Sequence, residues 1–218
     1  MLPPDPIAMS KTFDEIEMPF RLFKAPVDAA ATDEAGTCAV CDGEAEVRFG
    51  GACYRCFRAG GLDRTVDTEF GMVGAEEVMS GVTHGVPAET PEELGDDLDV
   101  VAKPIDPDFP EERWYGVRVP PDELQELTRT PGYHSWQGES WRFCCGRPAI
   151  FIGALSSEHL QQLAKDRESS LVDVALSVFG GSPPDAKHLL GELADGAVNT
   201  YGFRCQRCAN VRGHWDMD

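Results

Sequence analysis

The stretch "CAVCDGEAEVRFGGACYRCFRAGG" at residues 38–61 decides how the amino-terminal part of this chain folds. It holds two Cys-x-x-Cys pairs, Cys38 with Cys41 and Cys53 with Cys56. Zinc takes four ligands at the corners of a tetrahedron, and one such pair supplies two thiolates to one ion. The spacing therefore predicts a structural zinc site of four cysteines, in a compact module at residues 36–61 that folds only with its metal.

Two other interpretations of these cysteines are weaker. Buried, reduced cysteines without metal would not need to come in pairs, because packing alone does not impose that spacing. A thioredoxin-like redox motif occurs singly, at the start of a helix that follows a strand. Metal binding by the first four cysteines remains the prediction.

A third pair, Cys205 and Cys208 in "RCQRC", needs two more ligands to close a second zinc site. Successive side chains of an extended chain point in opposite directions, so one of the adjacent Cys144 and Cys145 is expected to be the likelier ligand. Cys145 is favoured, because the glycine that follows it suits a tight turn. For the fourth ligand His134 is put forward, with Cys144 and His214 as open alternatives, and a thiol cluster without metal as the alternative to a second zinc ion.

Composition limits the classes of partner and compartment. The 218 residues are 42% hydrophobic, enough for a sizeable core, and carry a formal net charge of −19. Such a field repels phosphate backbones, which makes nucleic acid an unfavoured partner. The sequence contains no secretion signal and no apolar run of about 18 residues. We therefore expect a cytoplasmic protein without a membrane partner, whose thiols stay reduced and available to metal.

The chain divides by composition into four predicted parts. Residues 1–35 read as a tail with one apolar docking segment, "MPFRLF", and residues 36–61 form the cysteine module. Residues 62–112 contain fifteen Asp and Glu against two Lys and Arg, a net charge of −13. We expect this acidic stretch to be a solvated loop or linker with at most short helical pieces.

Residues 113–218 are expected to form a mixed domain. Strands are predicted at 114–119 and 149–155, a helix at 121–130, and capped helices that begin near Ser156 and at Ser182, with the run 170–179 either continuing the first or standing alone. The last residues predict two strands folded about the third cysteine pair. The predicted class is α+β: a four-cysteine zinc module, then a domain with a small antiparallel sheet, flanking helices and a carboxy-terminal zinc-ribbon-like knuckle.

Signatures of catalysis are missing from the sequence. The chain has no GxxxxGK[ST], GxGxxG, GxSxG or HExxH motif, and no histidine is followed two residues later by glutamate as the zinc deaminases require. The aromatic segment Gly132–Trp141 could line a pocket, but packing of Tyr133, Trp136 and Trp141 in the core is the simpler interpretation. A non-enzymatic role is favoured.

Several segments together resemble the CbrC family of bacterial colicin-tolerance proteins. They are "RTPGYHSWQGESWRFCCGRPAIFIGAL" (129–155), "GFRCQRC" (202–208), "PFRLFKAPVDAA" (19–30) and the cysteine module with its trailing "FRAGG". In the family pattern the position of Cys145 is a cysteine, whereas that of Cys144 need not be. The resemblance implies tolerance of a nuclease toxin, without an established reaction. The shorter spacer between the first two pairs and the longer acidic insert leave partner specificity unassigned.

Three functions follow from these observations. The favoured one is a zinc-stabilised, acidic interaction or toxin-tolerance factor with a basic protein partner. The second is a zinc-ribbon factor that touches nucleic acid through Arg204, Arg207 and Arg212, helped by Tyr201 and Trp215. The third is a metalloenzyme with an open second site and Glu139 or His134 as base.

Overall fold

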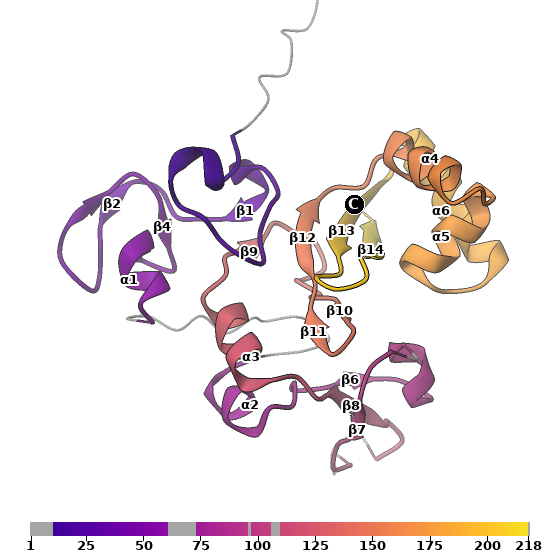
Figure 1. Cartoon of the computed structure of the whole chain (residues 1–218), viewed down its shortest axis with the longest axis horizontal. Coiled ribbons are helices and arrows are strands. Elements are labelled where there is room, and N and C mark those ends of the chain that lie inside the picture. Colours follow the sequence, from indigo (N-terminus) through magenta and orange to yellow (C-terminus); the bar gives the residue numbers. More distant parts are fainter. Residues whose placement is uncertain (1–10, 61–72, 96, 106–109, 218) are drawn as a thin grey trace, which may run out of the picture.

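The computed structural model describes residues 11–60, 73–95, 97–105 and 110–217, and the structural statements below concern these residues (Figure 1). The described chain combines helices with small antiparallel sheets, which confirms the predicted α+β class. The α-helices are α1 (Tyr54–Arg58), α2 (Ala75–Ser80), α3 (Pro121–Thr128), α4 (Ser157–Asp166), α5 (Leu171–Phe179) and α6 (Pro183–Asp195); the short 3-10 turns are η1 (Asp14–Ile16), η2 (Val27–Ala29) and η3 (Pro91–Leu94).

The strands are short apart from the last two. They are β1 (Ala30–Ala31), β2 (Gly36–Thr37), β3 (Glu44–Ala45), β4 (Arg48–Phe49), β5 (Ala52–Cys53), β6 (Val86–Pro87), β7 (Val100–Ala102), β8 (Trp114–Val117), β9 (Gly132–Tyr133), β10 (Phe143–Cys144), β11 (Arg147–Pro148), β12 (Ile150–Gly153), β13 (Val198–Arg204) and β14 (Val211–Met217).

The central sheet has the order β12-β13-β14 with antiparallel neighbours. Its β13–β14 hairpin pairs in register from Val198 opposite Met217 to Arg204 opposite Val211, and the third cysteine pair lies in the connection between these strands. On one side α5 packs against β14 and α6 against β13, closing a small apolar cluster of their own (Figure 1). The predicted two-strand ending is thus confirmed.

Serine caps fix where the carboxy-terminal helices begin. Ser156 Oγ accepts the N–H of His159 at 3.3 Å, and Ser170 Oγ accepts that of Asp173 at 3.1 Å. At the start of α6 the N–H of Ser182 donates to Asp185 Oδ2 at 2.8 Å. The run 170–179 therefore forms a separate helix rather than continuing α4.

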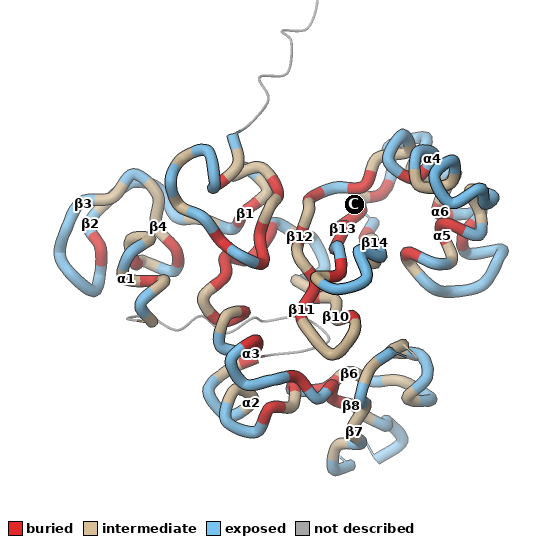
Figure 2. The backbone as a smooth tube through the Cα atoms, in the orientation of Figure 1, coloured by how far each residue is buried: buried red, intermediate tan, exposed pale blue. Residues whose placement is uncertain are grey.

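Three apolar side chains of the docking segment are buried. Phe20, Leu22 and Phe23 are at most 1% exposed and lie in the main core cluster (Figure 2). Phe20 contacts Phe49 of the cysteine module edge to face at 5.2 Å between ring centroids, and Phe23 contacts Phe151 of the central sheet at 5.0 Å. The segment therefore packs against both the cysteine module and the central sheet.

The described part of the acidic stretch is more ordered than a loop with short helical pieces. Besides α2 and η3 it contributes β6 and β7, which pair with the two edges of β8 to form a second three-stranded sheet. Charge composition missed these strands because β8 supplies their hydrogen-bonding partners from outside the stretch. Among the described residues, no helix has the length and apolar character needed to cross a bilayer.

Candidate metal centres

The first cysteine group is built by two hairpins and a short helix. Cys38 and Cys41 lie in the turn between β2 and β3, Cys53 ends β5, and Cys56 lies on α1. Hydrogen bonds close the turn, from the N–H of Cys38 to Gly43 O at 2.8 Å and from that of Asp42 to Cys38 O at 3.0 Å. These local hairpins and the helix start bring the four thiols together.

The geometry of this group fits a tetrahedral metal. All four sulfur atoms lie within 4.8 Å of one another, and Cys41 Sγ is 3.9 Å from Cys53 Sγ. A tetrahedron with metal–sulfur bonds of about 2.3 Å has edges of about 3.8 Å. The predicted convergence of Cys38, Cys41, Cys53 and Cys56 is observed, and the group could hold a metal ion.

Backbone N–H groups prepare one of these sulfurs to be a thiolate. Cys38 Sγ accepts hydrogen bonds from the N–H of Cys53 at 3.2 Å and of Val40 at 3.4 Å. The bond from Cys53 is the largest cause that lowers the pKa of Cys38 to about 6. Since metal ligation requires the deprotonated form, this turn favours binding.

The second group consists of Cys144, Cys145, Cys205 and Cys208. Their sulfur atoms also lie within 4.8 Å of one another; Cys144 Sγ is 3.6 Å from Cys208 Sγ and 4.0 Å from Cys145 Sγ. Burial raises the pKa of Cys205, but the N–H groups of Cys208 and Arg207 outweigh it and lower that pKa to about 7. The group could hold a second metal ion, with sulfur as all four donors.

Both adjacent cysteines face this group, although the alternation of side chains along an extended chain favoured one of them. Cys145 and Gly146 form the two-residue turn of the β10–β11 hairpin and have φ angles of 52° and 69°. Positive φ at both central positions is typical of the type I′ hairpin turn, which rotates the chain within one residue. The alternation rule for extended strands does not apply there, and both thiols point to the same place.

His134, the predicted fourth ligand, lies elsewhere. It is exposed, and its backbone N–H donates to Ala29 O at 3.1 Å. The other histidine considered, His214, is half-buried; its Nε2 lies 2.7 Å from Tyr133 Oη, and the loss of solvent around its ring lowers its pKa to about 3. The structure groups Cys144 with the other three cysteines in the place that His134 was expected to take.

A carboxylate from the acidic stretch contacts the second group. Asp97 Oδ2 accepts the N–H of Cys145 at 2.7 Å, and Asp97 Oδ1 lies 3.2 Å from Arg212 Nη2. Burial opposes ionisation, but the contacts with Cys145, Cys144 and Arg212 hold the pKa of Asp97 below its usual value. Nothing in the sequence indicated this contact, because Asp97 is 48 residues from Cys145.

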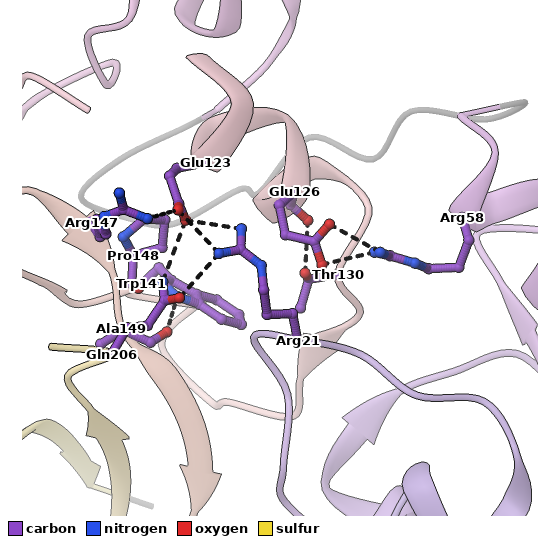
Figure 3. A network of polar contacts seen from close by, with 10 residues as sticks. All are labelled: Arg21, Arg58, Glu123, Glu126, Thr130, Trp141, Arg147, Pro148, Ala149 and Gln206. Carbon is purple, nitrogen blue, oxygen red and sulfur yellow. Dashed lines mark hydrogen bonds and ion pairs between the residues drawn. The ribbon is translucent and has the colours of Figure 1, made fainter. Parts of the chain in front are cut away.

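A second carboxylate, Glu123 on α3, contacts residues from both cysteine turns of the second group, Arg147 and Gln206 (Figure 3). Its side chain is 2% exposed and pairs with Arg21 at 2.9 Å and with Arg147, which follows the Cys145–Gly146 turn. It also accepts a bond from Gln206, which lies between Cys205 and Cys208 and donates to Pro148 O at 2.7 Å. Glu123 therefore positions both cysteine turns.

The aromatic segment behaves only in part as predicted. Tyr133 and Trp141 are buried in the core, but Trp136 is 75% exposed. Its loop is held by Asp216, whose Oδ2 accepts the N–H of Trp136 at 3.0 Å and the hydroxyl of Ser135 at 3.0 Å. A pocket beside this loop is lined by His134, Ser135, Trp136, Asn199 and Tyr201.

Comparison with known proteins gives a family but no activity. The chain is 32% identical over 91 residues to a UPF0167 protein of Pseudomonas aeruginosa, a match that covers 41% of this chain and 48% of that protein. The matched region thus spans about half the length of this relative. No solved structure matches the chain. The Uncharacterised protein family (UPF0167) matches residues 18–217, so the described fold with its two cysteine groups is that of a member of this family.

Proposed function

We propose that this protein binds two Zn²⁺ ions, one in each cysteine group, and acts as a zinc-stabilised binding protein rather than as an enzyme. The observation that carries the proposal is the gathering of all eight cysteines into two sets of four, each with its sulfurs within 4.8 Å. Thiolate donors in a tetrahedral set favour zinc over oxygen-seeking ions such as Mg²⁺ and Ca²⁺.

The closed donor sets support a structural role for both ions. A catalytic zinc keeps one position for water or substrate, whereas four cysteine ligands leave none. The metalloenzyme alternative required an open second site with His134 or Glu139 nearby. With Cys144 as fourth ligand, that site has no free position at which a water could be activated.

Charge and resemblance support a basic protein as the partner. The net charge of −19 accelerates encounter with cationic surfaces. The sequence resembles the CbrC family, so we propose tolerance of a cationic nuclease toxin as the context. The nucleic-acid alternative is weaker, because Arg212 is engaged with Asp97 and Tyr201 is only 8% exposed.

The same chemistry supports the cytoplasm as the compartment. All eight cysteines are free thiols in the structure, and reduced thiols persist in the cytosol. In an oxidising compartment, disulfide formation between these neighbouring sulfurs would compete with metal binding. A reducing compartment preserves the metal-binding form.

Metal counting tests the proposal. Protein purified without added metal should show two zinc ions per chain by native mass spectrometry and elemental analysis. Iron in place of zinc, or a protein that folds with fewer than two ions, would overturn the metal assignment.

A separate binding measurement tests the partner class. The nuclease domain of a colicin, titrated calorimetrically into the zinc-loaded protein, should bind at about 50 mM salt and lose most of its affinity at about 300 mM, because salt screens exposed charges. Absence of binding at low salt would remove the toxin-tolerance proposal and leave the metal assignment intact.

A further inference from the structure

A cavity of about 640 Å³ opens to solvent on the side of the second sheet that faces the carboxy-terminal helices. Its lining residues come from β6, η3 and β8, from residues 140–143, and from the end of α5 and the start of β14. This volume falls in the range of small-molecule sites. The cavity is separate from both sulfur clusters, although Asp97 and Phe143 lie on its edge toward the second one.

Polar and apolar groups share the wall about equally. Aromatic and aliphatic side chains converge on it from four elements or segments: Leu94, Leu98, Tyr115, Phe143, Val178 and Phe179. Such a lining favours a ligand with an apolar body. It does not by itself select the charge of that ligand.

A half-buried guanidinium supplies the polar selectivity. Arg142 lines the cavity together with the buried Ser140 and Trp141, and its Nε is shielded from solvent with no hydrogen-bond partner in the described structure. Arginine keeps its positive charge, and a buried donor that makes no bond is unfavourable until a partner arrives. The other guanidinium on the wall, that of Arg212, already pairs with Asp97.

We propose that this cavity binds a small organic anion, with its carboxylate or sulfonate on Arg142 and its apolar body between the second sheet and α5. The carboxylates on the wall do not oppose this arrangement strongly. Glu92 and Glu93 are exposed, where solvent and salt screen their charge, and Glu93 Oε1 accepts the N–H of Thr90 at 3.2 Å. A charge-assisted bond to a shielded guanidinium is the stronger interaction.

A pair of fluorescent probes separates charge from apolar contact. 1-Anilinonaphthalene-8-sulfonate and N-phenyl-1-naphthylamine share an apolar body, but only the first carries an anion. The zinc-loaded, full-length protein should bind one equivalent of the sulfonate, about tenfold or more tighter than the neutral probe, despite its net charge of −19. A preference for the neutral probe, or no saturable binding of either, would overturn the proposal.

Substitutions then locate the site. Arg142→Met should weaken sulfonate binding about tenfold or more and leave the neutral probe unchanged, whereas Arg118→Met, which removes an exposed arginine outside the cavity, should change neither. Ala88→Trp, which fills part of the cavity, should weaken both probes. Unchanged sulfonate binding in either Arg142→Met or Ala88→Trp contradicts the assignment.

Thermal melting and zinc content establish that each variant is folded. If Arg142→Met does not fold, Arg142→Lys replaces it, since lysine keeps the charge but cannot reproduce the planar set of donors. Weaker binding of the sulfonate with unchanged binding of the neutral probe supports the proposal. If folded Arg142→Lys binds the sulfonate with the same affinity as the wild type, the site is not specific for a guanidinium.

Discussion

Arg58 and Glu126 form a two-pronged ion pair, with Nη1–Oε1 and Nη2–Oε2 distances of 3.0 Å each, that fastens α1 to α3 (Figure 3). Arg58 lies two residues beyond Cys56 of the first cysteine group. One turn earlier on α3, Glu123 contacts Arg147 and Gln206, which belong to the turns of the second group. A single helix of eight residues therefore anchors both candidate metal centres.

The fourth ligand of the second centre can be decided by counting metal. Cys144→Ser should lower the zinc content from two ions per chain to one, because a hydroxyl is a poor replacement for a thiolate. His134→Ala should keep both ions. Elemental analysis of the two purified variants gives the answer, and a loss of zinc in His134→Ala would restore the histidine as a ligand.

Asp97 should tune the affinity of the second centre without binding the metal itself. Asp97→Asn weakens the bond that orients Cys145, and changes of this kind lower metal affinity about 10- to 100-fold. Zinc competition with a chromophoric chelator measures the effect. The control is Asp99→Asn, an exposed carboxylate two residues away that pairs with Arg118. Equal affinity in both variants would show that Asp97 has no such role.

Loss of the Glu123 charge should destabilise the fold. Glu123→Gln leaves Arg21 and Arg147 with weaker partners, and because those arginine side chains are 43% and 33% exposed, water offsets part of the loss. We expect a decrease of about 2 kcal/mol in the free energy of unfolding, below the values typical of fully buried pairs. Urea denaturation measures it, with the exposed Glu111→Gln as the matched control, which should change stability by less than about 0.5 kcal/mol.

The same substitution should alter the pH dependence of stability. Burial raises the pKa of Glu123, but its bonds and ion pairs with Arg21, Gln206 and Arg147 outweigh burial and lower it. Its contribution is therefore present above the unfolded value of about 4.3 and is lost as the pH falls through the folded value. The stability difference between wild type and Glu123→Gln should be constant from about pH 6 to 8 and shrink below about pH 4. A difference that grows in acid would reverse the sign of this assignment.

Asp216 should hold the loop that presents Trp136. Its carboxylate accepts hydrogen bonds from Ser135, from the backbone N–H of Trp136 and from Tyr201 Oη, the last at 3.0 Å. Asp216→Asn removes the charge and part of the accepting capacity, so we expect a loss of about 2 kcal/mol and faster amide hydrogen exchange at Trp136. The exposed Asp195→Asn should leave both unchanged; unaltered exchange in Asp216→Asn would mean that the loop is held by other contacts.

Local sequence was sufficient for the features that depend on neighbouring residues. The spacing of Cys38, Cys41, Cys53 and Cys56 predicted their convergence, because two hairpins and a helix start bring them together within 19 residues. Serine caps likewise predicted where the last helices begin. The division into four parts and the identity of the metal stay predictions.

The sequence predicted only part of the ligand set of the second centre, for two physical reasons. At Cys145 a positive φ removes the alternation of adjacent side chains; the glycine that follows indicated a tight turn, but not that Cys145 itself adopts this conformation. The ligands and the supporting carboxylates Asp97 and Glu123 come from segments that are far apart in the sequence. They lie together only because of the way the sheets and α3 pack. Sequence by itself determined which residues could bind metal; the tertiary structure alone decided that Cys144 rather than His134 joins the second set, since long-range packing sets which side chains meet.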